Sequence, residues 1–351
     1  MRSAAIIAIL AGRFAHSLAA PRDGERASRD DGGMIRIGIV GTSSISERFA
    51  EAVGHVDGVE VSRVASRDAQ RARAFAETIG AEGIAVGLDE LLGAGDVDAV
   101  YLASPNSAHV AQAQAALDAG IPVLVEKPAT LTAPQWEELV GRATARGVVL
   151  LEAMRTAYDP GLAAVADLLP RLGTVRRVSL RYEKRSARYD HVLAGEQTNI
   201  FDPALGGSAL RDLGVYPLHA LVHLFGVPRA VQGVRIGIAS GTDGLGSALA
   251  VYDGFVADIA WSKITDTALS SEIQGEEASL RIDAIDAPRS LELTPHGGDA
   301  EVIRVEAPEN VMVGEVVRLR DAIAGADVHA DHDRTTATLR LVDALLAEPL
   351  R

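Results

Sequence analysis

Two stretches of this chain carry side chains that could exchange a proton with a bound molecule: "VLVEKP" and "GGSALRDLGVYPLH". In the first, an apolar run that ends at Val125 is followed at once by Glu126 and Lys127, so an ammonium stands where a buried strand would finish. In the second, Asp212 and Tyr216 have the i, i+4 spacing that places both on one face of a helix. A lysine, a tyrosine and a carboxylate in contact could move a proton at a substrate hydroxyl, provided that the fold brings the two stretches together.

The chain from Met34 to Ala153 alternates between short apolar runs and helical patterns. The apolar runs are "IRIGIV", "VEVSRVA", "AVYLA", "PVLVE" and "VVLLEA". The amphipathic stretches between them end at Gly80, Gly120 and Gly147, and a glycine commonly follows a helix. Strands that alternate with helices indicate right-handed crossovers and a parallel sheet covered on both faces. Residues 34–153 are therefore predicted to form a doubly wound α/β domain of the Rossmann type.

The pattern changes after Ala153. A helix and the strand-like "VRRVSLRY" are followed by a polar loop over 183–202 and by a helix from about Arg211 to Phe225. Several strand-like runs then follow one another without intervening helices, which indicates a large, mostly antiparallel sheet. Two helices, near 311–323 and 331–346, close the chain. We therefore predict a second, α+β domain over 154–351 with an open-faced sheet.

Bulk properties exclude several classes of protein. The formal net charge of −14 argues against nucleic acid or an anionic membrane as a partner. The absence of cysteine excludes disulfides, thiolate metal sites and cysteine nucleophiles, and we expect no metal site. Residues 1–33 contain a short apolar stretch that is weakly signal-like, then a charged segment, and are predicted to be a flexible leader or a misassigned start. The expected location is the cytoplasm, with export left open.

The first strand-to-helix turn could hold a phosphate. Against the dinucleotide pattern G-x-G-x-x-G/A, the chain keeps Gly41 and has Ser43 in place of the second glycine. An ordinary turn capped by serine is the alternative, but the position after the first strand favours a cofactor. The second strand ends in Ala65, Ser66 and Arg67, where an NAD-preferring site usually has an acidic residue that binds the ribose. A hydroxyl and a guanidinium at this place suit the 2′-phosphate of NADP better than the bare ribose of NAD. Asp68, the next residue, is acidic, but it could cap the following helix instead of contacting the ribose.

Ligands of open α/β sheets lie beyond the carboxyl ends of the strands. Polar residues follow such an end in "YLASPNSAH", as they do in "VLVEKP". His219 comes three residues after Tyr216 and could join Asp212 and Tyr216 on their helix face. The three residues on this helix also have purely structural interpretations. Tyr216 could pack in the core, Asp212 could cap the helix, and His219 could be a buried histidine with satisfied hydrogen bonds.

Together these stretches resemble one family. "IRIGIVGTSSIS", "VASRDAQRARAFAETIG", "VYLASPNSAHVAQAQAALDAGIPVLVEKP" and "GGSALRDLGVYPLH" stand in the order found in the glucose–fructose oxidoreductase / inositol dehydrogenase / MocA (Gfo/Idh/MocA) family. The resemblance covers nearly the whole chain from Met34, and the EKP signature and the GG-x-x-L-x-D-x-G-x-Y pattern are its specific parts. Around "LLEAMRTAYDP" the chain looks most like the dihydrodiol and xylose-type dehydrogenase branch, which tends to use NADP.

The resemblance implies an NAD(P)-dependent oxidoreductase that transfers a hydride between the nicotinamide and a secondary alcohol or hemiacetal. The substrate would be a sugar, a polyol or a cyclic diol. It also implies a homodimer or homotetramer formed through the open sheet. Two alternatives stay open: a cofactor-binding regulatory protein without turnover, and a glycoside hydrolase that uses NAD for a transient oxidation.

The resemblance also implies roles for matching residues. Lys127, Asp212 and Tyr216 would be catalytic, with Tyr216 carrying the proton, Lys127 polarising the substrate oxygen and Asp212 orienting both; the reverse assignment of Lys127 and Tyr216 stays open. The residues expected to bind the cofactor are Gly41, Thr42, Ser43, Ser44, Ile45, Ser66, Arg67, Ser104, Pro105, Asn106, His109, Glu126 and Lys127. Those expected to bind substrate hydroxyls are Tyr158, His219, Arg188 and Asn199. Ser43, where the family more often has glycine, puts the closeness of the pyrophosphate in question, but not the fold.

Overall fold

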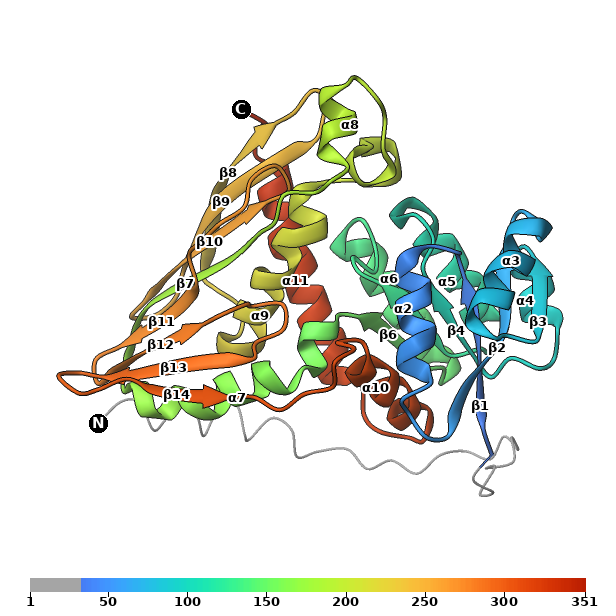
Figure 1. The fold of residues 1–351 in the computed structure, drawn as a ribbon, viewed down its shortest axis with the longest axis horizontal. Helices are drawn as coiled ribbons and strands as arrows, with labels where there is room; N and C mark the ends of the chain where they lie inside the picture. The colour runs from blue at the N-terminus through green and yellow to red at the C-terminus, as the bar shows by residue number, and fades with distance from the viewer. Residues whose placement is uncertain (1–32) are drawn as a thin grey trace. The chain divides into compact units, whose positions relative to one another are not determined.

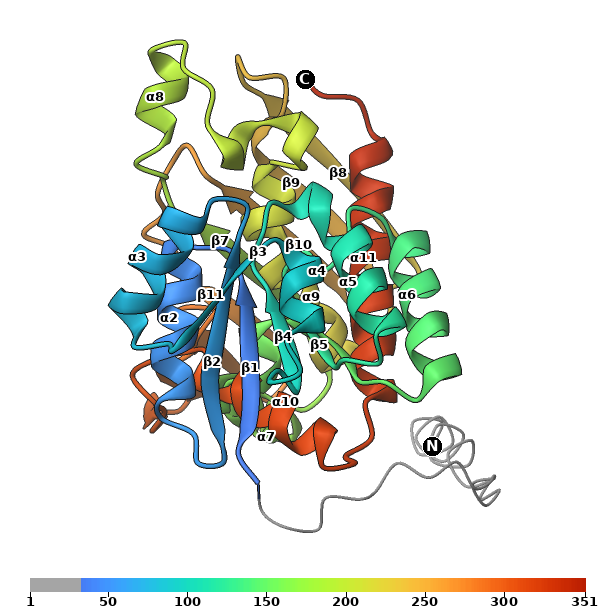
Figure 2. The ribbon, with the colours of Figure 1, turned by 90° about the vertical axis from the view of Figure 1, so that its right-hand side faces the viewer.

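The computed structural model describes residues 33–351, so the leader predicted for 1–33 lies outside the described residues except for Gly33. The first sheet has six parallel strands in the order β3-β2-β1-β4-β5-β6 (Figures 1 and 2). The strands are β1 (Ile35–Val40), β2 (Val59–Ser66), β3 (Gly83–Val86), β4 (Ala99–Leu102), β5 (Val123–Glu126) and β6 (Leu150–Ala153). The strand order reverses direction between β1 and β4, which is where such sheets bind ligands.

Helices cover both faces of this sheet, as the alternating pattern predicts. Phe49 and Val53 pack on one face, against Ile37 and Ile39, while Trp136 packs on the other. The helices that connect the strands are α2 (Ser44–Val53), α3 (Ala69–Ile79), α4 (Leu88–Gly93), α5 (His109–Asp118) and α6 (Ala133–Arg146), with a 3₁₀ turn η1 (Asn106–Ala108) before α5. The predicted Rossmann-type fold is confirmed. The sequence analysis missed β3 and α4, because each is short and has only one buried residue, so neither shows a clear apolar pattern.

The second sheet has eight strands in the order β14-β13-β12-β11-β7-β10-β9-β8. Neighbouring strands are antiparallel except β7 and β10, which run parallel. The strands are β7 (Val175–Glu183), β8 (Ala230–Gly237), β9 (Asp243–Val251), β10 (Val256–Ser262), β11 (Ser271–Gly275), β12 (Ala278–Ile282), β13 (Ser290–Pro295) and β14 (Glu301–Arg304). The predicted mostly antiparallel sheet is confirmed, and β14 is a short strand that the sequence analysis missed.

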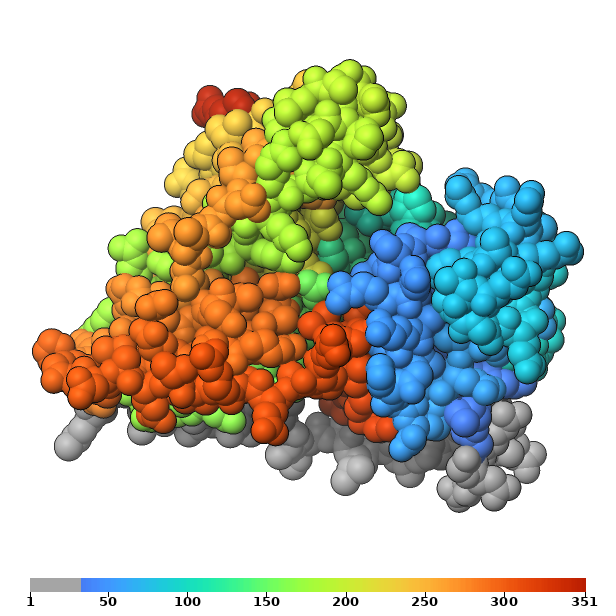
Figure 3. Space-filling model, viewed as in Figure 1, coloured from blue at the N-terminus to red at the C-terminus, as the bar shows by residue number. Residues whose placement is uncertain are grey.

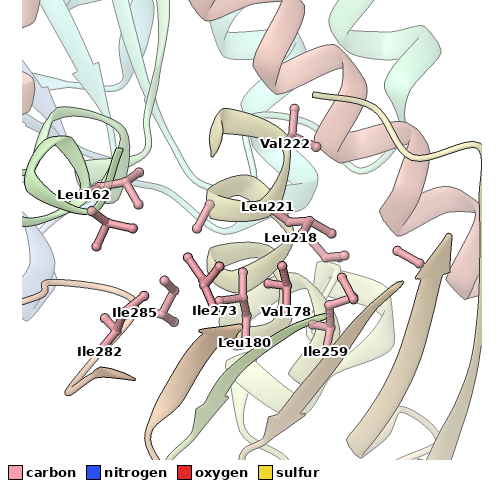
Figure 4. Close-up of a cluster of buried hydrophobic side chains, with 14 of the residues drawn as sticks. Leu162, Val178, Leu180, Leu218, Leu221, Val222, Ile259, Ile273, Ile282 and Ile285 are labelled. Carbon is pink, nitrogen blue, oxygen red and sulfur yellow. The ribbon is translucent and has the colours of Figure 1, made fainter. Parts of the chain in front are cut away.

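One face of the second sheet is covered by helices and the other is open. Val178, Leu180 and Ile273 alternate with outward-facing residues and pack against Leu218 and Leu221 of α9 (Figure 4). The remaining helical elements are η2 (Arg155–Tyr158), α7 (Pro160–Leu168), η3 (Leu169–Leu172), α8 (Tyr189–Leu193), η4 (Asn199–Phe201), η5 (Pro203–Leu205), η6 (Leu210–Gly214), α9 (Val215–Phe225), α10 (Val313–Ile323) and α11 (His329–Ala347). Within residues 33–351 no helix is both long and apolar enough to cross a membrane.

The last two helices connect the two sheets. Val316 and Leu319 of α10 belong to the same buried cluster as Ile37 and Phe49 of the first sheet's layer. Helix α11 lies beside α9 and α6, between the two sheets (Figure 1). A division of the chain at residues 153 and 154 therefore stays a prediction, because the C-terminal helices contribute to the core around the first sheet.

Two local features differ from the expected elements. The polar loop over 183–202 contains the short helix α8 and the turn η4. The helix expected from about Arg211 begins with the π-helical turn η6, and regular α-helix starts only at Val215. π-Helical turns inside helices are frequent at functional sites, and Asp212 lies in this one.

Candidate active site

A cavity of about 440 Å³ lies at the carboxyl ends of β1, β4 and β5, facing η6 and the 184–208 segment. Figure 3 shows the hollow between this segment, in yellow-green, and the blue residues of the first helix. The predicted site residues that line it are Ser43, Ser44, Ile45, Ser104, Pro105, Asn106, Glu126, Lys127, Arg188, Asn199, Asp212 and Tyr216. The fold therefore brings together the two stretches that the sequence analysis singled out.

Lys127 and Asp212 form the charged centre of the cavity. The Lys127 ammonium lies 2.6 Å from Oδ1 of Asp212 and also donates to the Asp212 carbonyl oxygen at 3.0 Å. Lys127 is held at the end of β5, where its peptide bond to Pro128 is cis. The start of η6 is held by the buried Asp243, which accepts from the backbone N–H of Leu210 at 2.8 Å. Both partners of the ion pair are thus attached to fixed parts of the two sheets.

Lys127 and Asp212 stabilise each other's ionised form. Burial by itself lowers the pKa of the Lys127 ammonium, but the carboxylate of Asp212 outweighs it, and the pKa lies well above its ordinary value. Burial raises the pKa of Asp212, yet the ammonium groups of Lys127 and Lys263 together hold it well below its usual range. Lys127 is therefore a cation at neutral pH in the protein without cofactor.

Tyr216 lies beside this ion pair. Its ring centroid is 5.1 Å from the Lys127 ammonium and 4.9 Å from the Arg155 guanidinium, and Tyr182 packs edge-on against it at 5.3 Å. Burial raises the pKa of the Tyr216 hydroxyl, while the two cations oppose that effect in part. The net pKa of the Tyr216 hydroxyl stays raised, so Tyr216 is a neutral phenol at neutral pH.

Glu126 points into the cavity from the end of β5. Its Oε1 accepts from the Tyr101 hydroxyl at 2.5 Å, and its Oε2 accepts from the backbone N–H of Lys127 at 3.1 Å. Burial raises its pKa, and Lys127 offsets part of that rise. The carboxyl of Glu126 is therefore fixed by two donors at the cofactor side of the cavity.

The turn after β1 requires a glycine and leads directly into the N-terminus of α2. Gly41 has φ of +114°, and a Cβ there would lie 2.6 Å from the carbonyl oxygen of Ala103. Ser43 precedes α2 and makes no side-chain capping hydrogen bond, so the first N–H groups of this helix are left to a ligand. Gly41 and Thr42 themselves do not line the cavity. The residues present fit a dinucleotide at this helix N-terminus.

The end of β2 lies next to this turn. The Gly41 N–H donates to the carbonyl oxygen of Ala65 at 3.1 Å, which places Ser66 and Arg67 immediately beyond it. Ser66 and Arg67 do not line the cavity, and the Arg67 side chain is exposed. Asp68 caps α3 by accepting from the N–H groups of Gln70 and Arg71. Its carboxylate is therefore occupied, as the helix-cap alternative supposes.

Besides Gly41, Thr42, Ser66 and Arg67, three more predicted site residues do not line the cavity. His109 is fully buried, and its two ring nitrogens lie 3.1 Å from the carbonyl oxygen of Pro128 and 2.9 Å from that of Ser104, so it packs between the two strand-end loops from behind. The Tyr158 hydroxyl donates to Asp331 at 3.2 Å. His219 is 1% exposed, and burial lowers its pKa to about 3. Neither Tyr158 nor His219 lines the cavity, so the structure gives no support to substrate binding by these two residues.

The sequence analysis did not name several residues that belong to the site. Arg155 and Tyr182 line the cavity, and Arg155 is paired with Asp286 at 2.6 Å. Arg155 follows the end of β6 by two residues, so the rule about strand ends could have found it. Lys263 contacts the second oxygen of Asp212. The only feature of the sequence that singles out Lys263 is that lysine is rare: of the 34 basic residues in the chain, three are lysines.

Comparison with known proteins is consistent with this geometry. Residues 35–154 match the model of the oxidoreductase family with an NAD-binding Rossmann fold, and residues 170–281 match the GFO/IDH/MocA C-terminal domain. The scyllo-inositol 2-dehydrogenase (NADP(+)) of Bacillus subtilis is 38% identical over 282 residues, which is 80% of this chain and 86% of that one. The dTDP-3,4-didehydro-2,6-dideoxy-alpha-D-glucose 3-reductase of Streptomyces violaceoruber is 32% identical over 90% of this chain and 85% of its own.

Among solved structures, a 3-ketoreductase from Actinomadura kijaniata in complex with NADP and TDP-benzene superposes with a TM-score of 0.80. It is 26% identical, and the match covers 90% of this chain and 98% of that one. The finer assignment to the dihydrodiol and xylose-type branch stays a prediction. Two family models that together match well over half of the sequence, and relatives above 30% identity along most of their length, agree on one assignment. The chain belongs to the Gfo/Idh/MocA family of oxidoreductases.

Proposed function

We propose that this protein is an NADP-preferring oxidoreductase that acts on a secondary alcohol, or on the corresponding ketone, of a sugar, polyol or cyclic diol. The observation that carries the proposal is the contact of Lys127 with Asp212 beside Tyr216, at the floor of a cavity that begins at the α2 N-terminus. The relatives named above, an inositol dehydrogenase and a sugar ketoreductase, support the same class of substrate.

The proposed mechanism assigns a proton task to each residue of the site. A bound nicotinamide supplies the hydride acceptor or donor. The Lys127 ammonium polarises the substrate oxygen, and the Tyr216 hydroxyl exchanges a proton with that oxygen. Asp212 keeps Lys127 charged and directed into the cavity. Arg188 and Asn199 line the same cavity from the 184–208 segment, where they can donate hydrogen bonds to the other hydroxyls of the substrate.

The protonation state favours one direction of the reaction at neutral pH. With Lys127 charged and Tyr216 neutral, the site already holds a proton for the oxygen of a carbonyl substrate. Oxidation of an alcohol requires that the phenol first give up its proton. Reduction should therefore proceed at neutral pH, and oxidation should speed up as the pH rises.

The cofactor preference can be tested with one residue. Wild-type protein is expected to turn over a panel of sugars, cyclitols and aromatic diols with a lower KM for NADP than for NAD. Arg67→Ala should raise the KM for NADP about tenfold or more, because a charge-assisted contact with the 2′-phosphate is lost, and leave NAD unchanged. Absorbance of the reduced nicotinamide measures both, with the exposed Arg304 on β14 changed to alanine as the control. Equal losses with NADP and NAD would contradict the assignment of Arg67.

The open face of the second sheet supports a homo-oligomer. Val251 and Val256 are paired across β9 and β10, and with Leu249 they form an exposed apolar patch, 40%, 38% and 47% exposed in that order. Leu249→Asp is expected to lower the molar mass measured by light scattering, because a charge would be buried in the interface. Leu269→Asp, which changes an exposed leucine away from the strands, should not. A monomeric wild type would overturn this part of the proposal.

The proposed location of the protein is the cytoplasm, in keeping with its proposed use of NADP.

A further inference from the structure

Asp212 is shared by two lysines. Lys127 contacts Oδ1 at 2.6 Å, and Lys263 contacts Oδ2. Lys127 faces the cavity, whereas Lys263 is 2% exposed and lies on the other side of the carboxylate. The two ammonium groups and one carboxylate carry a net charge of +1. A single ion pair at this place would be neutral.

The choice of residue type at these positions is informative. The chain has 34 basic residues, and the three lysines among them are Lys127, Lys184 and Lys263. Two of these three meet at one carboxylate, in a protein that otherwise uses arginine for positive charge. An ammonium can lose its proton in a folded protein and a guanidinium cannot. Lysine at both positions thus allows the charge of this cluster to change.

Lys263 also connects Asp212 to the segment that lines the substrate end of the cavity. Its ammonium lies 5.0 Å from the ring centroid of Phe201, in the turn that carries Asn199. Its carbonyl oxygen accepts from the N–H of Ser186 at 2.9 Å, two residues before Arg188. Its own N–H donates to Gly244 of β9 at 2.8 Å. Lys263 therefore contacts the Asp212 carboxylate and the Phe201 ring through its side chain, and the start of the 184–208 segment through its backbone.

We propose that Lys263 is a positioning residue of this active site. Its ammonium holds the second oxygen of Asp212, and the charge on that ammonium decides how much of the carboxylate is left to Lys127. While Lys263 is charged, Asp212 is shared, and the Lys127 ammonium stays incompletely neutralised and polarises a substrate oxygen strongly. Once Lys263 loses its proton, Asp212 pairs with Lys127 alone and weakens that effect. The inference rests on the proposed function, because it assigns a role within that reaction.

The charges around the cluster are consistent with Lys263 as the lysine that titrates first. Burial lowers its pKa, and Asp212 opposes this effect only in part. The charged groups that face it are Asp212, Lys127 and Arg188. Those that face Lys127 are Asp212, Tyr216 and Glu126. Lys127 has the raised pKa of the pair, so the proton leaves Lys263 before it leaves Lys127.

The proposal is tested by the titration of the lysines themselves. Lysine labelled with a heavy carbon isotope at Cε gives three resonances in this protein, which can be assigned by single substitutions. We expect the Lys263 resonance to titrate below the ordinary range of a lysine side chain. In Lys127→Met it should move about one pH unit or more to the alkaline side, because a neighbouring like charge is removed. Lys184→Met should leave it unchanged.

Turnover supplies a second measurement. Lys263→Met should lower kcat about tenfold with little change in the KM for cofactor, and Lys263→Arg should restore most of kcat. In the wild type, the rate of carbonyl reduction should fall over the pH range in which the Lys263 resonance titrates, and in Lys263→Arg this fall should be absent. A Lys263 resonance that titrates in the ordinary range of a lysine side chain and does not respond to Lys127→Met would overturn the proposal. A fall in the wild-type reduction rate that persists unchanged in Lys263→Arg and Lys263→Met would overturn it as well.

The two hypotheses can fail separately. A wild-type protein that turns over no member of the panel, while its Lys263 resonance still responds to Lys127→Met, removes the proposed function and leaves the coupling of the two lysines standing. Full turnover with no such response removes the role of Lys263 and leaves the proposed function standing. If Lys263→Met does not fold, the titration of Lys263 in the wild type and in Lys127→Met still decides the matter.

Discussion

Lys127→Met is expected to lower kcat about a thousandfold while nucleotide binding persists. The substitution keeps a side chain of similar length and removes the only ammonium that lines the cavity among residues 33–351. A positioned cation at the reacting oxygen is worth about two to three powers of ten in rate. Asp212 keeps Lys263 as a partner, so the fold should tolerate the change. Turnover by absorbance and cofactor affinity by calorimetry measure the two effects separately.

Lys184→Met is the matched control for this experiment. It removes one of the other two lysines, and its side chain is exposed on the segment that follows β7. Its activity should equal that of the wild type. If Lys127→Met turned over at the wild-type rate with cofactor bound, Lys127 would have no part in the chemistry.

Tyr216→Phe is expected to lower kcat about a hundredfold or more with almost no loss of stability. Only the hydroxyl is removed, and the ring keeps its contacts with Tyr182, Lys127 and Arg155. A positioned acid or base contributes about two to four powers of ten. In the oxidation direction the wild-type rate should rise with pH as the phenol loses its proton, and this rise should vanish in Tyr216→Phe. Rate–pH profiles and thermal unfolding measure these effects.

The same profiles decide between the two assignments of the proton. If the alkaline rise persists in Tyr216→Phe and vanishes from the residual activity of Lys127→Met, Lys127 carries the proton and Tyr216 orients it. Tyr252→Phe, which removes a hydroxyl that donates to Gly226 far from the cavity, should keep both rate and profile.

Local patterns were enough to predict most of the fold. The spacing of apolar residues in "IRIGIV" and "VEVSRVA", and glycines such as Gly80 and Gly147 after helices, predict elements that the structure confirms. The sequence analysis missed β3 and β14, because these four-residue strands are mostly exposed or half-buried and carry no continuous buried run, whereas β4, β5 and β6 have the same length and are buried throughout. The sequence analysis also did not predict that α10 packs against the first sheet. The apolar positions of α10 show that one of its faces is buried, but they do not show in which of the two cores.

The same distinction applies to the residues of the candidate active site. Residues at strand ends, such as Glu126, Lys127 and Asn106, could be found because the carboxyl edge of a parallel sheet is a place that the sequence order implies. Tyr158 and His219 were named for their residue type, and whether such a side chain faces a cavity or a core depends on the neighbouring helices. Arg155 was missed although it follows a strand end.

The sequence was enough to predict that a lysine directly follows β5 and that an aspartate and a tyrosine share a helical stretch, because both features depend only on neighbouring residues. The tertiary structure alone decided that Asp212 meets Lys127, 85 positions away, and Lys263, 51 positions away. The order of strands in two sheets brings these groups together, and no local preference of the chain records that order. Where two ammonium groups meet one carboxylate, their protonation depends on the fold as much as on the residues.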